Sequence, residues 1–246
     1  MALPPSFTAK LVSARMISRF VRELTFARRD GSAMIFEAGQ WVSLALPSED
    51  MPGGELRRAY SSASAPDGSP RFAVAVTHVE GGPGSTMLHE MELGTEIPVI
   101  GPQGFFTRPL DESGPSLFIC TGTGYTPLRS ILMDALARGE KRALWVVVGN
   151  RSETDIIYGD ELDAMVTAHP NVRADYTLSR APSSWTGRTG YVQAHVRELW
   201  TEMARRDEGM AHAYICGLQR MVGAVRDLLR KDMGLLREQV HSERYD

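Results

Sequence analysis

Two glycine-containing turns in the second half of the chain have residue types suited to nucleotide binding. The first, TGTG, follows an apolar run, and the second starts with Cys216 and Gly217 at the end of another apolar run. Glycines between a strand and a helix let the backbone approach a pyrophosphate, and the first helical amides donate hydrogen bonds to it. The candidates in the first turn are Gly122, Thr123 and Gly124. The alternatives are a tight turn without a ligand and, for Cys216, a buried thiol that acts as a small apolar residue.

Arginines follow the next two strand candidates of this half. The first of these strands ends in Gly149, Asn150 and Arg151, without the carboxylate that holds a ribose 2′-hydroxyl in NAD-binding domains. Ser179 and Arg180 come directly after the second strand, and a further arginine, Arg188, follows eight residues later. Arginine offers a permanent, forked donor for phosphate, so a pair of them favours the 2′-phosphate of NADPH. The alternative is that both are solvated loop charges.

The first half contains a second set of candidate residues, in the sequence RAYSSAS at 58–64. On a strand, Arg58 and Tyr60 point to one face, and Ala59 and Ser61 point to the other. An arginine neutralises a pyrophosphate, a tyrosine stacks on a flavin ring, and a hydroxyl binds the ring edge. An exposed sheet edge with polar side chains is the alternative. A further glycine turn leads into a short helix and is again suited to phosphate; its candidates are Pro83, Gly84, Ser85 and Thr86.

The elements that must position these residues differ between the two halves. Short apolar-polar alternations at 41–46, 57–62 and 71–79, separated by Asp-Gly and Gly-Gly turns, predict an antiparallel β-barrel. One helix is expected within 85–92, opened by Ser85 or Thr86, and 101–106 is expected to be a turn that closes the barrel.

Beyond the linker at 111–115, apolar strands alternate with amphipathic helices. The strands are expected at 116–120, 143–149, 172–178 and 213–216. The first helix is expected to have Pro127 in its first turn, and the other helices are expected at 160–168, 193–206 and 218–231. This alternation predicts a doubly wound α/β domain with a parallel sheet. We therefore expect two domains, a β-barrel over 1–111 and an α/β domain over 115–246.

Composition excludes several classes of function. The net charge of −3 is unlike that of a nucleic-acid-binding domain, and no apolar run approaches the ~20 residues of a membrane helix. Two cysteines cannot ligate an iron–sulfur cluster, which needs four ligands, and we expect no metal site. The N-terminus lacks the charged and apolar regions of a secretory signal, so we expect a cytoplasmic protein. We also expect a monomer.

Together, these motifs resemble those of the ferredoxin–NADP⁺ reductase superfamily over nearly the full length of the chain. RAYSSAS resembles its RxYSxxS flavin motif, and Phe36 to Gln40 resembles the strand that approaches it. Gly84, Ser85 and Thr86 fall where its second pyrophosphate turn lies. TGTGYTP resembles its GTGxxP motif, and Cys216-Gly217 its CG motif.

The resemblance implies a role for each matched residue. Arg58 binds the FAD pyrophosphate, Tyr60 stacks on the isoalloxazine and Ser61 bonds near N5. The flavin is lined by Val76, Thr77 and His78, and phosphate is held by Pro83, Gly84 and Ser85. Thr123 lies between flavin and nicotinamide, with Cys216 close to the reacting ring. The 2′-phosphate is read by Arg180 and Arg188, with help from Arg151. The aromatic tail residue Tyr245 shields the flavin, although here it is penultimate rather than terminal.

The activity that the resemblance implies is hydride transfer between NADPH and FAD, followed by single-electron transfer to ferredoxin or flavodoxin. That partner is a separate protein, because the chain carries no cysteine cluster of its own. Two alternatives stay open: an NADH-dependent reductase component of an oxygenase system, and a flavin-binding relay subunit that does not react with free NAD(P)H.

Overall fold

The computed structural model describes residues 5–49, 51, 53–112 and 114–245. The chain forms two compact units. The first unit comprises Met1–Arg108 and Arg129–Asp134, and the second comprises Pro109–Leu128 and Ala135–Asp246. Of the expected linker at 111–115, Ser113 lies outside the described residues.

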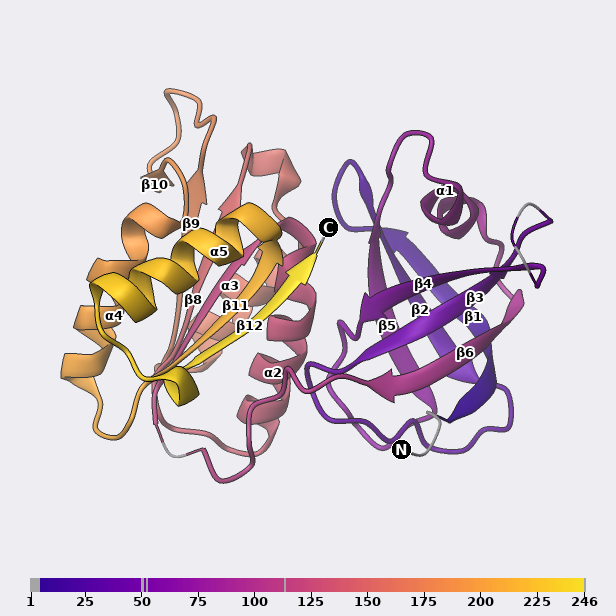
Figure 1. Ribbon diagram of the computed structural model, residues 1–246, viewed down its shortest axis with the longest axis horizontal. Helices are drawn as coiled ribbons and strands as arrows, with labels where there is room; N and C mark the ends of the chain where they lie inside the picture. Colours follow the sequence, from indigo (N-terminus) through magenta and orange to yellow (C-terminus); the bar gives the residue numbers. More distant parts are fainter. Residues whose placement is uncertain (1–4, 50, 52, 113, 246) are drawn as a thin grey trace. The chain divides into compact units, whose positions relative to one another are not determined.

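The first unit is built around one antiparallel sheet of six strands (Figure 1). The strands are β1 (Ser6–Met16), β2 (Val21–Arg28), β3 (Trp41–Pro47), β4 (Glu55–Ser61), β5 (Arg71–Thr77) and β6 (Glu96–Gln103). Their order is β4-β3-β6-β1-β2-β5. Ser62, just beyond β4, forms a bridge with Val74 of β5, so the two ends of the sheet meet and the sheet closes into the expected barrel.

The barrel is filled by apolar side chains that alternate along the strands. Leu11, Leu24, Phe26, Leu44 and Val99 are fully buried in this core. The sequence did not predict strand β1. Only Ala9 and Leu11 of its 11 residues are buried, so its apolar–polar alternation is weak.

Two local expectations for the first unit are wrong. Helix α1 is Pro83–Glu90 rather than a helix opened by Ser85 or Thr86; Pro83 takes its first position, where proline needs no hydrogen-bond partner. Residues 101–103 end strand β6 instead of forming a turn. Glycine at position 101 lets the two strands pack closely, because a Cβ there would lie only 3.1 Å from Val42 Cγ1 in the neighbouring strand.

The second unit has a parallel sheet of six strands, in the order β10-β9-β8-β7-β11-β12. The strands are β7 (Ser116–Thr121), β8 (Leu144–Asn150), β9 (Val172–Leu178), β10 (Arg188–Thr189), β11 (His212–Leu218) and β12 (Val240–Tyr245). The helices are α2 (Tyr125–Ala137), of which Arg129–Asp134 belong to the first unit, α3 (Gly159–Ala168), α4 (Gln193–Arg206) and α5 (Gln219–Asp227). This is the expected doubly wound arrangement.

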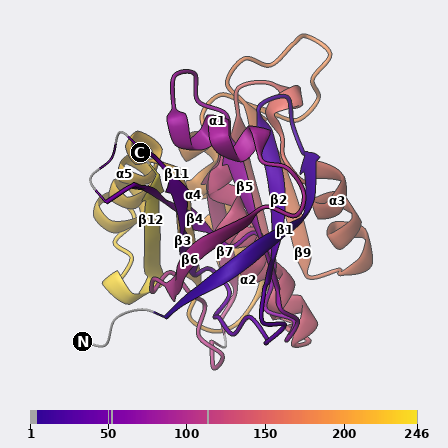
Figure 2. The same cartoon turned by 90° about the vertical axis from the view of Figure 1, so that its right-hand side faces the viewer.

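The helices cover both faces of this sheet. Helices α4 and α5 pack on one face, where Val196, Leu199 and Val222 meet Leu117 and Ile119 of β7. Helices α2 and α3 lie on the opposite face (Figures 1 and 2). The helix expected at 218–231 is α5 followed by a π-helical turn, Leu228–Asp232, and the last strand, β12, was not expected. None of the helices in the described residues is long and apolar enough to cross a membrane.

Candidate functional site

The start of α1 and the side chain of Arg58 form an anion-binding arrangement in the first unit. Because α1 begins at Pro83, the amides of Gly84 and Ser85 have no acceptor within the helix. Arg58 of β4 is exposed and lies against this turn: a Cβ on Gly84 would be 3.0 Å from Arg58 Cγ. Helix amides and a guanidinium both bind phosphate oxygens. The arrangement therefore fits the pyrophosphate of a dinucleotide.

The hydroxyls of this turn are engaged within the turn itself. Ser85 Oγ accepts from the Val79 amide (3.1 Å) and lies 3.0 Å from the Gly82 carbonyl, to which it donates. Thr86 Oγ1 donates to the same carbonyl (3.1 Å). Ser85 and Thr86 therefore shape the loop, and its binding capacity lies in the backbone amides. Pro83 is exposed beside them.

Strand β4 presents the remaining residues of the RAYSSAS motif. Ala59 is exposed, Tyr60 is half-buried and packs against the barrel core, and Ser61 is buried. Burial raises the pKa of Tyr60 to about 12, and the nearby Arg58 lowers it slightly. The Tyr60 phenol stays neutral at physiological pH.

The end of β5 offers side chains of unequal access. Val76 is fully buried in the barrel core, so it can line a ligand only through its backbone, and its carbonyl already lies 2.8 Å from His89 Nε2. Thr77 and His78 are exposed. The His78 ring packs edge-on against His89, with ring centres 5.1 Å apart.

Two polar residues of α2, Arg129 and Ser130, hold the loop that follows Ser61, and sequence reasoning missed both. Arg129 Nη1 donates to the Ala63 carbonyl, and Ser130 Oγ donates to the Ser64 carbonyl at 2.7 Å. Both side chains are buried. One sequence feature could have indicated their role: an arginine and a serine lie next to the apolar stripe of a helix that directly follows a glycine motif.

The two glycine turns of the second unit pack against each other. Gly122 has a φ of +51°, and a Cβ added there would meet no atom within 4 Å, so open space lies on that side of the backbone. A Cβ on Gly124 would lie 2.7 Å from the Gly217 Cα, and the amide of Leu218 lies 3.4 Å from Thr121 Oγ1. Strands β7 and β11 are neighbours, so the close approach follows from their pairing. The structure thus brings both predicted nucleotide motifs to one edge of the sheet, where ligands of such folds bind.

Thr123 and Cys216 differ in access at this edge. Thr123 is half-buried, and its carbonyl accepts a hydrogen bond from Thr126 Oγ1 (2.7 Å). Cys216 is fully buried. Burial raises the pKa of the Cys216 thiol well above its ordinary value, and the charge of Glu243 raises it further. The thiol is therefore protonated and cannot act as a nucleophile. The Cys216 side chain can contribute to the site through packing and weak hydrogen bonding.

The penultimate residue lies in an ordered strand and not in a free tail. Strand β12 pairs in parallel with β11, which places Tyr245 opposite Leu218. Its hydroxyl lies 3.4 Å from Thr126 Oγ1, and its side chain hydrogen-bonds Cys216. Tyr245 is thus anchored next to the glycine turns of its own unit; Asp246 lies outside the described residues. Shielding of a flavin by Tyr245 stays a prediction.

Arg151 and Arg180 lie side by side at the carboxyl edge of β8 and β9. The Arg180 amide donates to the Arg151 carbonyl (2.9 Å), and the Ser179 amide donates to the Asn150 carbonyl (3.0 Å). Both arginines are exposed, and neither side chain has an ion pair or hydrogen bond among the described residues. These two guanidiniums are therefore available to an anion.

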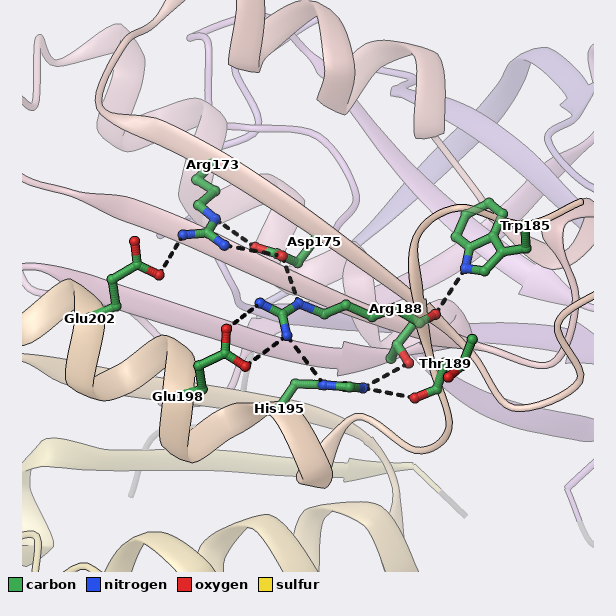
Figure 3. Close-up of polar contacts among 9 residues, drawn as sticks. Arg173, Asp175, Trp185, Arg188, Thr189, His195, Glu198 and Glu202 are labelled. Atoms are coloured by element: carbon green, nitrogen blue, oxygen red, sulfur yellow. Dashed lines mark hydrogen bonds and ion pairs between the residues drawn. The ribbon is translucent and has the colours of Figure 1, made fainter.

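Arg188 has a different environment (Figure 3). Its guanidinium forms a bidentate ion pair with Glu198 of α4, with both distances 2.9 Å. Its Nε donates to Asp175 of β9 at 2.8 Å. The hydrogen bonds to these carboxylates, led by Glu198, raise the pKa of Arg188 above its ordinary value. The structure thus groups Arg151 with Arg180 and leaves Arg188 bound to carboxylates.

Comparison with known proteins identifies the two units. Residues 8–107 match the oxidoreductase FAD-binding domain family, and residues 118–227 match the oxidoreductase NAD-binding domain family. The chain is 55% identical to ferredoxin–NADP reductase B of Sorangium cellulosum, over 98% of each chain. It is 28% identical to the phenol hydroxylase P5 protein of Acinetobacter pittii, over 85% of this chain and 58% of that protein.

A solved structure shares the fold. The ferredoxin NADP⁺ reductase of Neisseria gonorrhoeae, crystallised with FAD and NADP, aligns with a TM-score of 0.81 at 21% identity, over 97% of this chain and 98% of that one. At this identity the similarity concerns the fold alone. The identity of more than half over nearly the full length, together with the two matched domains, places the chain by sequence. The chain belongs to the ferredoxin–NADP reductase family of FAD- and NAD-binding oxidoreductases.

Proposed function

We propose that this chain catalyses hydride transfer between NADPH and FAD and passes single electrons to a ferredoxin or flavodoxin. Bound FAD supplies the redox chemistry that links two-electron to one-electron transfer. The chain's own residues bind and orient the two dinucleotides. The relative named ferredoxin–NADP reductase B, 55% identical over 98% of the chain, supports this assignment.

The observation that carries the proposal is that each unit has its own glycine turn suited to a pyrophosphate. In the first unit, Arg58 and the amides of Gly84 and Ser85 would hold the FAD pyrophosphate, and neutral Tyr60 would stack on the ring. In the second unit, the backbone at Gly122 would approach the nicotinamide nucleotide. A helix begins directly after this turn, at Tyr125, and its amino end favours negative charge.

The preference for NADPH rests on Arg151 and Arg180. Both guanidiniums are exposed at the carboxyl edge of the sheet and have no carboxylate bound among the described residues. The 2′-phosphate of NADPH would supply an anionic partner for these two guanidiniums. Strand β8 also ends at Asn150, where an NAD-binding domain of this architecture carries an acid for the ribose hydroxyl.

Anaerobic stopped-flow mixing with NADPH and with NADH tests the proposal, with the flavin absorbance as the readout. We expect Arg180→Ala to lower kcat/KM for NADPH about ten- to hundredfold, in line with a hydrogen-bonded charge pair, and to leave NADH within about twofold. Arg205→Ala, which alters an exposed arginine at the far end of α4, is the matched control. An unchanged NADPH preference in Arg180→Ala would refute the role of this residue.

An NADH-dependent reductase component of an oxygenase is the second candidate, and one observation favours it. Arg188 is already bound by Glu198 and Asp175, which makes one of the expected phosphate ligands less available. A kcat/KM for NADH that equals or exceeds that for NADPH would support this candidate. A yellow protein that reacts with neither nucleotide would instead indicate a relay subunit.

We further propose that the enzyme works as a cytoplasmic monomer with a separate ferredoxin-type partner. The described residues contain no helix that could span a membrane, and a relative that is 55% identical to the chain is named ferredoxin–NADP reductase B. Light scattering would give the oligomeric state. Reduction of an added ferredoxin or flavodoxin, followed by its absorbance, would identify the class of acceptor.

A further inference from the structure

Arg188 lies in an ion-pair chain that crosses from β9 to α4 (Figure 3). Arg173 donates to Asp175 (2.8 Å) and to Glu202 (2.8 Å), and Asp175 also accepts from Arg188. Glu198 forms the outer end of the chain. Arg206 pairs with the other oxygen of Glu202 (2.7 Å), so the chain contains three carboxylates and three guanidiniums and its formal charges balance.

The hydrogen-bonding capacity of Arg188 is nearly filled by this chain. Nε donates to Asp175, and Nη1 and Nη2 each donate to one oxygen of Glu198. His195 Nδ1 lies 3.3 Å from Nη1, and His195 Nε2 lies 3.0 Å from the Thr189 carbonyl. The Thr189 carbonyl accepts the Nε2 hydrogen, which leaves Nδ1 to accept from Arg188.

The two carboxylates differ in how readily they can be displaced. The Asp175 side chain is 14% exposed and is shared with Arg173, whereas the Glu198 side chain is 61% exposed and binds only Arg188 among the residues of this chain of ion pairs. Glu198 also occupies the Nη1–Nη2 edge, which is the edge that binds phosphate in a bidentate manner. A phosphate that arrives from solvent therefore competes with Glu198 and not with Asp175.

The backbone of Arg188 lies near the carboxyl end of β9, and its guanidinium reaches back along this strand to Asp175. In the sheet register, Arg188 of β10 lies opposite Thr177 of β9. Arg180 comes three residues after Thr177 in the sequence. Strand β9 ends at Leu178, so both arginines flank the carboxyl edge of one strand. Arg180 is free of carboxylates among the described residues, and Arg188 is not.

We propose that Glu198 is a specificity-determining residue that weakens binding of a 2′-phosphorylated nucleotide by occupying the phosphate-binding edge of Arg188. The inference rests on the proposed nucleotide site of the second unit. In this arrangement Arg180 and Arg151 attract the 2′-phosphate, and Glu198 limits how strongly NADPH is preferred to NADH. The exchange is reversible, because Glu198 is an exposed residue of a helix surface and its carboxylate returns when the phosphate leaves.

The test measures binding and not turnover. Isothermal titration of the FAD-loaded protein with 2′,5′-ADP and with 5′-AMP gives the ratio of the two dissociation constants, which isolates the contribution of the 2′-phosphate. Glu198→Gln keeps the side-chain shape and removes the charge. We expect it to raise the preference for 2′,5′-ADP about three- to fivefold, the upper part of the range for exposed ion pairs, with 5′-AMP affinity unchanged.

Two further variants separate this role from a general effect of charge. Glu202→Gln removes a carboxylate one turn along the same helix, which binds Arg173 and not Arg188, and we expect less than a twofold change in the ratio. In an Arg188→Gln background, Glu198→Gln should have no effect on the ratio, because the guanidinium for which Glu198 and the phosphate compete is absent. Melting temperature and flavin absorbance report whether each variant is folded.

The outcomes distinguish the inference from the function on which it rests. If 5′-AMP binds but Glu198→Gln leaves the ratio unchanged, or if Glu202→Gln raises it equally, the role of Glu198 is refuted and the nucleotide site stands. A Glu198→Gln effect that persists without Arg188 also refutes it. If neither compound binds the wild-type protein, the proposed nucleotide site and this inference fail together.

Discussion

Replacing Gly124 by alanine tests whether the two glycine turns of the second unit depend on each other. A Cβ at this position would lie 2.5 Å from the Cys216 carbonyl carbon and 2.7 Å from the Gly217 Cα. Carbon atoms in contact normally stay about 3.5–4.0 Å apart, so one turn must move by about 1 Å. The atoms in the way are backbone atoms of β11, which cannot rotate aside.

The magnitude follows from overpacking at a buried position. Such insertions cost about 1–3 kcal/mol of the free energy of unfolding, and we expect this loss for Gly124→Ala. A displacement of this size at the backbone that approaches the nucleotide should also weaken 5′-AMP binding about tenfold or more. The FAD content should be unchanged, because the substitution lies in the second unit.

Urea unfolding and nucleotide titration measure both effects. The matched control is Gly223→Ala in α5, where an added Cβ meets no atom within 4 Å; we expect it to stabilise the protein by about 0.4–1 kcal/mol. If Gly124→Ala unfolds like the wild type and binds 5′-AMP equally well, the tight packing of the two turns has no energetic role and the reasoning is wrong.

Three further predictions concern groups outside this junction. Burial, together with the neighbouring His212, lowers the pKa of His241 to about 4 from an ordinary value of 6.5. As the pH falls, His241 therefore becomes protonated in the unfolded protein before it does so in the folded protein. Its stabilising contribution is complete above pH 6.5 and is lost as the pH falls towards 4; melting temperatures over this range should fall less in His241→Gln, and an equal fall would contradict the assignment. The Cys216 thiol should react with iodoacetamide in the native protein at pH 8 at least a hundredfold more slowly than in urea, as followed by mass spectrometry, because it is buried and protonated. Arg22→Met should cost about 1–3 kcal/mol in urea unfolding and should loosen FAD, because the guanidinium of β2 bonds the carbonyls of Leu88 and Met91 at the end of α1 (3.0 and 3.1 Å); unchanged FAD affinity would show that this tie does not position the helix.

Local sequence patterns were sufficient for the fold class of this protein. Apolar alternation with Asp-Gly and Gly-Gly turns predicted the barrel, and buried strands alternating with amphipathic helices predicted the parallel sheet. These signals are strong because burial of one face or both faces repeats along the chain. The glycine motifs were equally readable, since the positive φ at Gly122 and the close approach at Gly124 depend on residue type.

Pairing of distant residues was beyond the reach of the sequence. The sequence indicates an arginine at 188, but its ion pair with Glu198 depends on where β10 and α4 lie in space. Residue type alone gives Arg180 and Arg188 the same capacity to bind phosphate, whereas the structure separates them by their neighbours. Similarly, the bonds from Arg129 and Ser130 to the flavin-motif loop join segments 66 residues apart.

The C-terminal strand shows the same division between local and tertiary information. Val240–Tyr245 has a weak apolar pattern, with no residue fully buried, so its sequence alone reads as a polar tail. Pairing with the open edge of β11 makes it a strand, because an edge strand presents unpaired amides and carbonyls that a neighbouring segment can satisfy. The sequence by itself determined which residues could bind dinucleotides. Only the tertiary structure decided which of their side chains are available, because charge pairing and edge pairing depend on distances in space.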